Sequence, residues 1–450
     1  MPTKTLANFT SGLRFEDLPS DVVLAAKQCL LDHLGVALAG SVETSSKIMA
    51  KTAAEIMGGT GCNLVTPGFP QASLLQAALV NGAFGHALDM DDVHNAAIIH
   101  LAVVTIPAAL ALGQVNKING RSFITAVVAG YDIGARIGLA VNPSSYFYWH
   151  TTGTVGTFAA TATCANILGL TPDQTVHAFG SAGTQAAGLW EFLSDGAMSK
   201  FLHTGKACVN GIISAQLAKN GYTAATRILE GEKGFIRAVA PEPNFDVLTK
   251  DLGKPFKILE NSFKPYPSCK HTHPSIYATQ KIIEETGVKF QDVKNIMLKV
   301  YSVAENLVGN KEPKTPYGAK FSLPYCVSAA LYYGEVGIRQ FREDTVNNPE
   351  VQALMKRVDV VVDEEIEKQY QANPNQWTQQ VEITTKDGKT LVKRIDFPKG
   401  DPENPFTFEE TVTKFHLLTA DLLPEEQRNR LVEKVIRLES LGNISELFAI

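Results

Sequence analysis

The chain has few cysteines and no long apolar run. Its six cysteines are widely scattered over 450 residues and none forms a C-x-x-C pair, which is typical of reduced thiols in a cytosolic protein. The longest apolar segment, around residues 101–113, is too short and too rich in alanine for a membrane span. The N-terminus contains no apolar signal-peptide core. We therefore expect a cytoplasmic protein without a membrane partner.

An excess of charge of either sign is also absent. Lysine and arginine number 41 and aspartate and glutamate 46, which gives a net charge of −5. There is no basic patch or run of lysine and arginine, so no nucleic-acid partner is expected. Any anionic substrate must then be held by locally placed cations, because the chain has no overall positive field.

The first half of the chain has the periodicity of helices. At roughly 150 residues per domain, 450 residues predict two or three domains. Residues 5–240 carry apolar side chains at three-to-four spacing, with short connections that contain Gly, Pro, Asn or Asp. Stretches such as residues 153–168 are rich in Ala, Gly and Thr, and small side chains let helices approach closely. We expect a tight helical bundle here.

From about residue 256 the pattern changes. Residues 292–305 and 357–366 alternate as half-buried strands do, and two further alternating runs flank an Asp-Gly pair at 387–388, which is a hairpin signal. Helical patterns return at 407–446. The predicted fold class is therefore mainly α. We expect a large helical domain from residues 1–256 and 405–450, and a smaller α+β lid domain from residues 257–404.

One stretch places many titratable side chains between apolar flanks. Three carboxylates and three histidines stand within residues 86–100. They are Asp89, Asp91, Asp92, His86, His94 and His100. Charged groups are rarely buried unless they are paired, bound to a ligand or used in chemistry. We interpret the stretch as one wall of an active site; a polar loop between two helices is the alternative.

Two further stretches supply cations and histidines. His150 precedes a predicted helix that begins near Thr151, and the free N–H groups of that helix would favour an anion. A helix-capping segment is the alternative for these residues. Lys200, His203 and Lys206 share roughly one helical face among small apolar residues, which fits either anion binding or a surface face.

A proline-rich loop and a tyrosine complete the candidates. The loop side chains are Lys264, Cys269, Lys270, His271 and His273. The two histidines form an H-x-H pair, but no partner Cys or His stands at structural-zinc spacing, so we expect a cationic loop at a domain junction instead. Tyr325 stands near the start of an apolar helix, where a tyrosine is usually a core residue unless other functional groups lie beside it.

These stretches, in this order, resemble the MmgE/PrpD family. The matching strings are NGAFGHALDMDDVH, WHTTGTVGTF, MSKFLHTGKA, FKPYPSCKHTHP and KFSLPYCV. The resemblance covers essentially the whole chain. It implies a large helical domain made of both chain ends, a smaller α/β lid domain and a homodimer.

The resemblance also implies a set of site residues. By position, the family's site would comprise Asp89, His100, His150, Lys200, Lys264 and Tyr325. As further substrate contacts we expect Asp92, Cys269, Lys206 and Lys270. Two positions depart from cis-aconitate decarboxylases: Val93 replaces a threonine after the double Asp, and Cys269 replaces a histidine in the loop. The resemblance to the decarboxylase is therefore weaker at the chemistry than at the fold.

Known reactions of the family move a proton on a carbon next to a carboxylate of a small di- or tricarboxylic acid. The resemblance thus implies a cofactor-independent lyase, with dehydration foremost and epimerisation or decarboxylation as alternatives. Lys200 and Lys264 would neutralise substrate carboxylates. His150 or His100 would exchange the proton, since histidine titrates near working pH. No metal and no organic cofactor is expected.

The roles of Asp89 and Tyr325 are further expectations, and two other classes of protein are alternatives to a cofactor-independent lyase. Asp89 would orient a histidine, and Tyr325 would give or take a second proton. A metal-dependent hydrolase or lyase is the competing class. Its ligands would be Asp89, Asp91, His94 and His100. A non-catalytic binding protein that kept the cleft is the third class.

Overall fold

The computed structural model describes residues 1–373 and 375–450, and its contacts divide them into two compact units. Unit 1 comprises Met1–Ala87, Asp91–Phe263 and Thr407–Ile450. Unit 2 comprises Leu88–Met90 and Lys264–Phe406. Both chain ends thus belong to unit 1, which extends to Phe263 where the sequence placed a boundary after residue 256.

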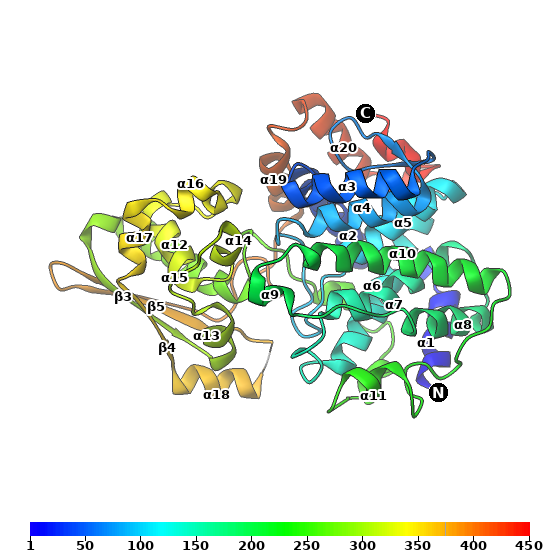
Figure 1. Cartoon of the computed structure of the whole chain (residues 1–450), viewed down its shortest axis with the longest axis horizontal. Coiled ribbons are helices and arrows are strands. Elements are labelled where there is room, and N and C mark those ends of the chain that lie inside the picture. Colours follow the sequence, from blue (N-terminus) through cyan, green and yellow to red (C-terminus); the bar gives the residue numbers. More distant parts are fainter. Residues whose placement is uncertain (374) are drawn as a thin grey trace. The chain divides into compact units, whose positions relative to one another are not determined.

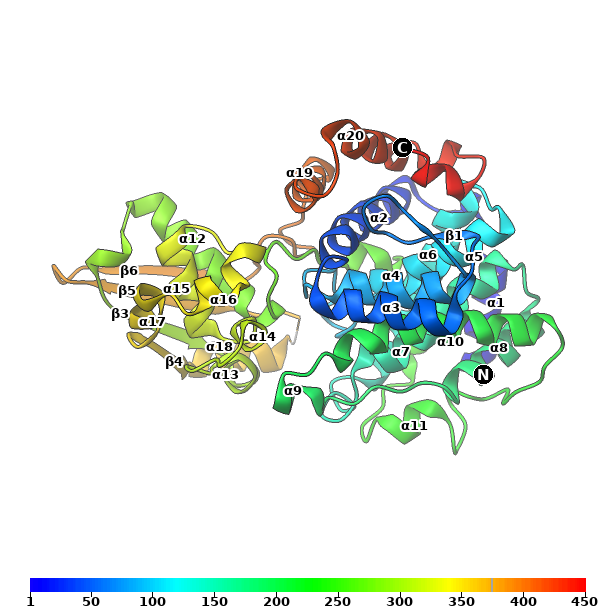
Figure 2. The same cartoon turned by 45° about the horizontal axis from the view of Figure 1, so that its top comes forward.

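Unit 1 consists almost entirely of helices (Figure 1). They are α1 (Pro2–Gly12), α2 (Ser20–Gly40), α3 (Thr44–Met57), α4 (Leu74–His86), α5 (Ala102–Asn116), α6 (Gly120–Val141), α7 (Thr151–Ile167), α8 (Pro172–Gly183), α9 (Phe192–Asp195), α10 (Ser199–Lys219), α11 (Phe235–Val239), α19 (Phe408–Thr419) and α20 (Glu425–Ile436). A short hairpin joins β1 (Cys62–Asn63) to β2 (Gln71–Ala72). Helix α7 packs against α6 and α10, and α10 also packs against α4 (Figure 2).

Glycines allow these central helices to approach closely. A Cβ added to Gly205 of α10 would lie 2.1 Å from the carbonyl oxygen of Leu79 in α4. A Cβ on Gly82 of α4 would lie 2.9 Å from the Cα of Gly205. The two backbones therefore meet where neither has a side chain, and the predicted close packing through small residues is confirmed.

Two helices of unit 1 pass a simple test for membrane spans. Ser20–Gly40 and Gly120–Val141 are long and apolar enough by length and composition. However, 78% and 94% of their apolar windows are buried inside the structure, as in core helices. Most of each apolar window is therefore packed against other parts of the chain.

Unit 2 is an α+β unit around a four-stranded sheet. Its strands are β3 (Val293–Val300), β4 (Val358–Val362), β5 (Gln379–Thr385) and β6 (Thr390–Ile395). Its helices are α12 (His273–Thr286), α13 (Ser302–Val308), α14 (Pro316–Ala319), α15 (Leu323–Tyr333), α16 (Glu343–Val346), α17 (Pro349–Met355) and α18 (Glu364–Ala372). The strand order is β4-β3-β5-β6, with β3 and β4 parallel and the other pairs antiparallel. Helix α12 packs against β5, β6 and α15 (Figure 1).

The hairpin predicted at the Asp-Gly pair is confirmed. Strands β5 and β6 pair antiparallel around it, and Gly388 adopts a φ of 88°, which favours glycine. The two other predicted strands are too long. After β4, the Asp363 side chain accepts the N–H groups of Glu365 and Ile366 and starts α18. A helix therefore replaces the second half of the predicted strand at 357–366, and α13 shortens the strand predicted at 292–305 in the same way.

Candidate active site

The titratable stretch lies in the connection between α4 and α5. Backbone hydrogen bonds between His94 and Ile99 close a tight turn, and Val93 pairs with Ser262. Within the turn, Ile98 has a φ of 49°, a left-handed conformation that is rare for a β-branched residue. The connection is therefore held in one shape by its own backbone contacts, and not by a regular element.

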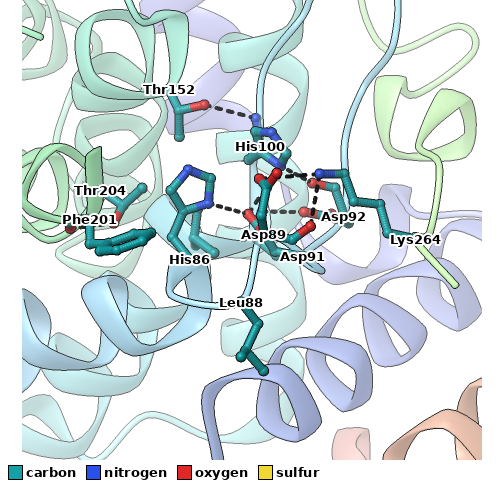
Figure 3. Close-up of polar contacts among 12 residues, drawn as sticks. His86, Leu88, Asp89, Asp91, Asp92, His100, Thr152, Phe201, Thr204 and Lys264 are labelled. Carbon is teal, nitrogen blue, oxygen red and sulfur yellow. Dashed lines mark hydrogen bonds and ion pairs between the residues drawn. The ribbon is translucent and has the colours of Figure 1, made fainter. Parts of the chain in front are cut away.

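Asp91 lies between two histidines at the centre of this stretch (Figure 3). Its Oδ2 is 2.8 Å from Nδ1 of His86 and 3.0 Å from Nδ1 of His100. Nδ1 of His100 is also 2.7 Å from the carbonyl oxygen of Asp92. A carbonyl oxygen only accepts, so Nδ1 of His100 carries a proton and donates it. The lone pair of a neutral His100 is then on Nε2, the atom that can act as a base.

Burial and charge fix the ionisation of this group. Burial alone would raise the pKa of the Asp91 carboxyl, but His100 and His86 outweigh it and hold that pKa well below its usual value. Burial lowers the pKa of His86 to about 4, although Asp91 opposes this shift. At neutral pH the pair therefore consists of an aspartate anion and a neutral His86 ring.

The carboxylate of Asp92 is fully used by protein donors. Its Oδ1 accepts the N–H of Ala102 at 3.1 Å, and its Oδ2 accepts Tyr131 Oη at 2.5 Å and Asn261 Nδ2 at 2.7 Å. Burial raises the pKa of Asp92 to about 6. The structure therefore favours a structural role for Asp92 over the substrate contact that we expected.

His150 lies at the start of α7, close to the same histidines. Its ring stacks on His86 with centroids 5.7 Å apart and an interplanar angle of 20°. Thr152 of the same helix accepts the backbone N–H of His100 at 3.2 Å (Figure 3). Burial, helped by His86 and Lys200, lowers the pKa of His150 well below its usual value. In the described structure its side chain makes no capping bond to α7, so capping does not explain this histidine.

Helix α10 brings a buried lysine to these rings. Lys200 is only 3% exposed, and its charge contributes to the lowered pKa values of His86, His150 and His203. A buried ammonium beside neutral imidazoles favours an anionic ligand. Lys206 of the same helix, expected as a further substrate contact, is exposed.

Asp89 and Lys264 form a buried ion pair within unit 2. Lys264 Nζ lies 3.0 Å from the carbonyl oxygen and 3.3 Å from Oδ1 of Asp89, and each side chain is 2% exposed. Asp89 has a φ of 55°, a conformation that costs a non-glycine residue on the order of 1–3 kcal/mol. Strained residues of this kind cluster at functional sites. Asp91 makes the histidine contacts that we expected of Asp89.

Tyr317 of α14 is a candidate that the sequence did not single out. Burial, followed by the charge of Asp89, raises the pKa of its phenol well above the usual value. Cys269 contributes to the same shift, so this loop cysteine lies near the phenol. The Cys269 backbone N–H donates to the Lys320 carbonyl at 2.9 Å, and Lys320 Nζ donates to the Leu88 carbonyl at 2.8 Å.

Two other candidates of unit 2, Tyr325 and Lys270, are buried and bonded to other groups of the protein. Tyr325 is completely buried, and its hydroxyl donates to the backbone carbonyl of Gln340. Lys270 is paired with Asp401 at 2.7 Å, and both side chains are buried. For Tyr325 and Lys270 the structure therefore favours core roles over the catalytic and substrate-binding roles that we expected.

The histidines of the loop are engaged separately. His271 contacts the Tyr301 hydroxyl and stacks on Trp377 with centroids 4.2 Å apart. His273 Nε2 lies 3.2 Å from the Ser268 carbonyl oxygen. Nothing in the described residues brings the H-x-H pair together as metal ligands.

One group of described residues brings three potential metal ligands close together. Ligand atoms of His86, Asp91 and His100 lie within 4.8 Å of one another. His94, which our competing hypothesis named as a ligand, is not in this group: its Nδ1 accepts the Ala97 N–H, and its Nε2 lies 3.3 Å from Glu260. Because Nδ1 of His100 donates to a carbonyl, His100 would have to bind an ion through Nε2.

Comparison with protein families identifies the chain. The MmgE/PrpD N-terminal domain matches residues 4–248, and the MmgE/PrpD C-terminal domain matches residues 266–438. The chain belongs to the MmgE/PrpD family. Both the suspected family and the mainly α fold class are therefore confirmed.

Relatives within the MmgE/PrpD family span almost the whole chain. The cis-aconitate decarboxylase-like protein oryM of Aspergillus oryzae is 29% identical, over 100% of this chain and 96% of its own length. Cis-aconitate decarboxylase of Aspergillus terreus is 26% identical, over 99% and 94%. The 2-methylcitrate dehydratase of Cupriavidus necator is 22% identical, over 92% and 90%.

Sequence reasoning missed the contact between His86 and Asp91. Asp91 was named only as a metal ligand of the competing class, and His86 only as a member of the titratable stretch. Helical spacing could not pair them, because His86 ends α4 and Asp91 follows in a loop without periodicity. The available signal was the high density of titratable side chains within residues 86–100. It marked this stretch as a candidate site but could not show which of its side chains contact one another.

Proposed function

We propose that the protein is a cofactor-independent lyase that moves a proton next to a carboxylate of a small tricarboxylic acid. The observation that carries the proposal is that the buried side chains of His86, Asp91 and His150 lie together with the partly exposed His100, near the cation of Lys200. The relatives support the class of reaction, since they are named for decarboxylation or dehydration of such acids.

His100 is the proposed general base. Asp91 and the Asp92 carbonyl hold its Nδ1–H, so a neutral His100 presents Nε2 as the proton acceptor. When Nε2 takes the proton, the ring becomes a cation 3.0 Å from an aspartate anion, which stabilises it. His100 is also the more exposed partner, at 14% of its side chain against 0% for Asp91, so a substrate can reach it.

Lys200 is the proposed partner of a substrate carboxylate. Its buried ammonium would balance both the ground-state carboxylate and the charge that develops when the adjacent carbon loses a proton. His150 would exchange the second proton from its position beside His86. That Asp89 and Lys264 serve the same substrate stays a prediction.

Dehydration and decarboxylation share this proton transfer. We placed dehydration first from the sequence. The decarboxylase relatives are the more similar ones, at 25–29% identity over 99–100% of the chain. Cis-aconitate is therefore the first substrate to test, followed by 2-methylcitrate and citrate.

Proton NMR in heavy water tests the proposal. We expect consumption of one of these acids, or deuterium incorporation next to a carboxylate, by the wild-type protein. Removal of an acid–base group costs on the order of 10²–10⁴ in rate, so His100→Ala should lose at least that much. Lys219→Ala, an exposed lysine on the same helix as Lys200, is the matched control for Lys200→Ala and should keep full activity.

Two results would favour the competing classes. Stoichiometric metal in the purified protein, with activity lost on chelation, would support a metal enzyme built on His86, Asp91 and His100. Calorimetric binding of tricarboxylates without turnover of any tested acid would support a binding protein.

We also propose a homodimer formed through one face of unit 1. Large apolar side chains are exposed there: Phe147 (80%), Tyr148 (66%) and Leu189 (54%). The two segments are adjacent, because Trp149 pairs with Leu189 through the backbone. Exposed apolar clusters of this kind mark interaction sites. Phe147→Asp should shift the mass measured by light scattering from dimer to monomer, and an unchanged dimer would contradict this face.

A further inference from the structure

His203 faces His150 from the neighbouring helix. It lies one turn after Lys200 on α10, and its ring is half-buried. Nδ1 of His203 is 3.0 Å from Nδ1 of His150, with ring centroids 5.2 Å apart. The same His150 ring also stacks on His86. His150 thus connects the buried histidine group with a ring that reaches the surface of unit 1.

Two facing Nδ1 atoms can bond only if they share one proton. A neutral imidazole has one N–H and one lone pair, so one ring must donate from Nδ1 and the other must accept. Burial and Lys200 lower the pKa of His203 to about 4, and burial lowers that of His150 further below its usual value. Both rings are therefore neutral at pH 7, and the tautomer of each ring sets the tautomer of the other.

Two glycines make room for the His203 ring. A Cβ on Gly153 would lie 3.0 Å from the Cβ of His203, and a Cβ on Gly188 would lie 3.2 Å from its Nδ1. Gly188 also has a φ of 152°, which L side chains rarely adopt. Its carbonyl accepts the backbone N–H of His150 at 3.0 Å, so the same glycine adjoins the His203 ring and the backbone of His150.

We propose that His203 is a positioning residue and proton relay, through which the buried His150 exchanges protons with solvent. This inference rests on the proposed function, in which His150 is a proton-exchanging group. It adds a role for His203 that does not require contact with the substrate.

The relay conserves protons at each step. In the starting state His150 carries Nδ1–H, and His203 carries Nε2–H with a lone pair on Nδ1. His150 Nε2 takes a proton from the substrate while its Nδ1–H passes to Nδ1 of His203. The His203 cation then releases its Nε2 proton to water. When His150 later returns its Nε2 proton to the reacting molecule, it recovers the Nδ1 proton from His203. Nε2 of His203 takes a proton back from water at the same time, and the pair is reset.

Activity measurements with a matched control test the relay. We expect His203→Ala to lower the turnover of cis-aconitate at least tenfold, and added imidazole to restore part of it. His203→Asn keeps a polar group near Nδ1 but cannot pass a proton, so it should be impaired and should gain nothing from imidazole. His177→Asn is the control, because His177 is also half-buried but bonds to the backbone of Ala224. Rates within twofold of wild type in both His203 variants would overturn the relay.

A spectroscopic measurement separates this inference from the proposed function. With ¹⁵N-labelled histidine and no substrate, we expect a downfield ring N–H proton that disappears in His203→Asn and persists in His177→Asn. If it is present but no acid turns over, the proposed function fails and the shared proton stands. If acids turn over but the resonance is absent from the wild type, the relay fails and the function stands.

Discussion

The replacement Asp91→Asn tests the electrostatic centre of the site. In the wild type, Oδ2 of Asp91 accepts Nδ1–H groups from His86 at 2.8 Å and His100 at 3.0 Å. An asparagine oxygen can accept the same two bonds, so the variant changes the charge but keeps the shape. The buried anion that stabilises a protonated His100 is then missing.

The expected loss of activity in Asp91→Asn follows from the difference between a hydrogen bond to a charged acceptor and one to a neutral acceptor. Hydrogen bonds to charged groups contribute about 1.5–3 kcal/mol, and neutral ones about 0.5–1.5 kcal/mol. The transition state in which His100 is protonated should therefore lose about 1–2 kcal/mol, which is roughly a 5- to 30-fold lower rate at 1.36 kcal/mol per tenfold.

A second contact limits the loss. When an aspartate alone holds a catalytic histidine, its replacement by asparagine selects the wrong tautomer and costs about 10⁴. Here the Asp92 carbonyl, 2.7 Å from Nδ1 of His100, keeps the proton on that nitrogen. Asp91→Asn should therefore be clearly less damaging than His100→Ala.

The assay is kcat/KM for the acid that the wild type consumes, measured with folded protein. Circular dichroism and thermal unfolding establish that the fold is kept, and Asp173→Asn, an exposed aspartate on α8, is the matched control. Unchanged kcat/KM in folded Asp91→Asn would refute the electrostatic role of Asp91. A loss as large as that of His100→Ala would refute the limiting role of the Asp92 carbonyl.

Three other predictions concern stability and metal. Burial lowers the pKa of His33 from 6.5 to about 4, so its stability contribution is complete above pH 6.5 and is lost as pH falls towards 4. In urea unfolding, the drop in the free energy of unfolding between pH 8 and 5 should be about 2 kcal/mol smaller in His33→Leu than in the wild type, because the other buried histidines titrate in both proteins. Gly205→Ala should lower the free energy of unfolding by at least about 2 kcal/mol, because its Cβ would lie 2.1 Å from the Leu79 carbonyl oxygen. An unchanged midpoint in urea unfolding would show that α4 and α10 can separate freely. Exhaustive chelation should leave the turnover rate unchanged, and a loss restored by one divalent metal would contradict a cofactor-independent reaction.

Much of the fold was predictable because its signals are local. The hairpin at the Asp-Gly pair depends on a turn that needs a positive φ at Gly388, and that requirement is visible in the residue type. Helical periodicity and the change of pattern near residue 256 likewise reflect which face of each segment is buried. The strand at 357–366 was overestimated because Asp363 can either continue an extended run or cap a helix, and its contacts decide for the cap.

The sequence predicted several residues of the candidate site, but it did not predict the contacts between them. His100, His150 and Lys200 were named from their stretches, and the structure buries His150 and Lys200 and places His100 against Asp91. Tyr325 and Lys206 came from the same reasoning, yet one is a core residue and the other is exposed. Residue type does not distinguish these cases, because burial depends on segments far away in the chain.

The sequence by itself determined the family, the mainly α class and the density of titratable groups between two apolar helices, because each of these depends on residue type and spacing. Only the tertiary structure decided that the carboxylate of Asp91, and not that of Asp92, contacts the histidines, and that His203 meets His150. Asp91 and Asp92 lie in a loop, where no periodicity sets the direction of a side chain. His150 and His203 belong to α7 and α10, which come together only through packing across the bundle.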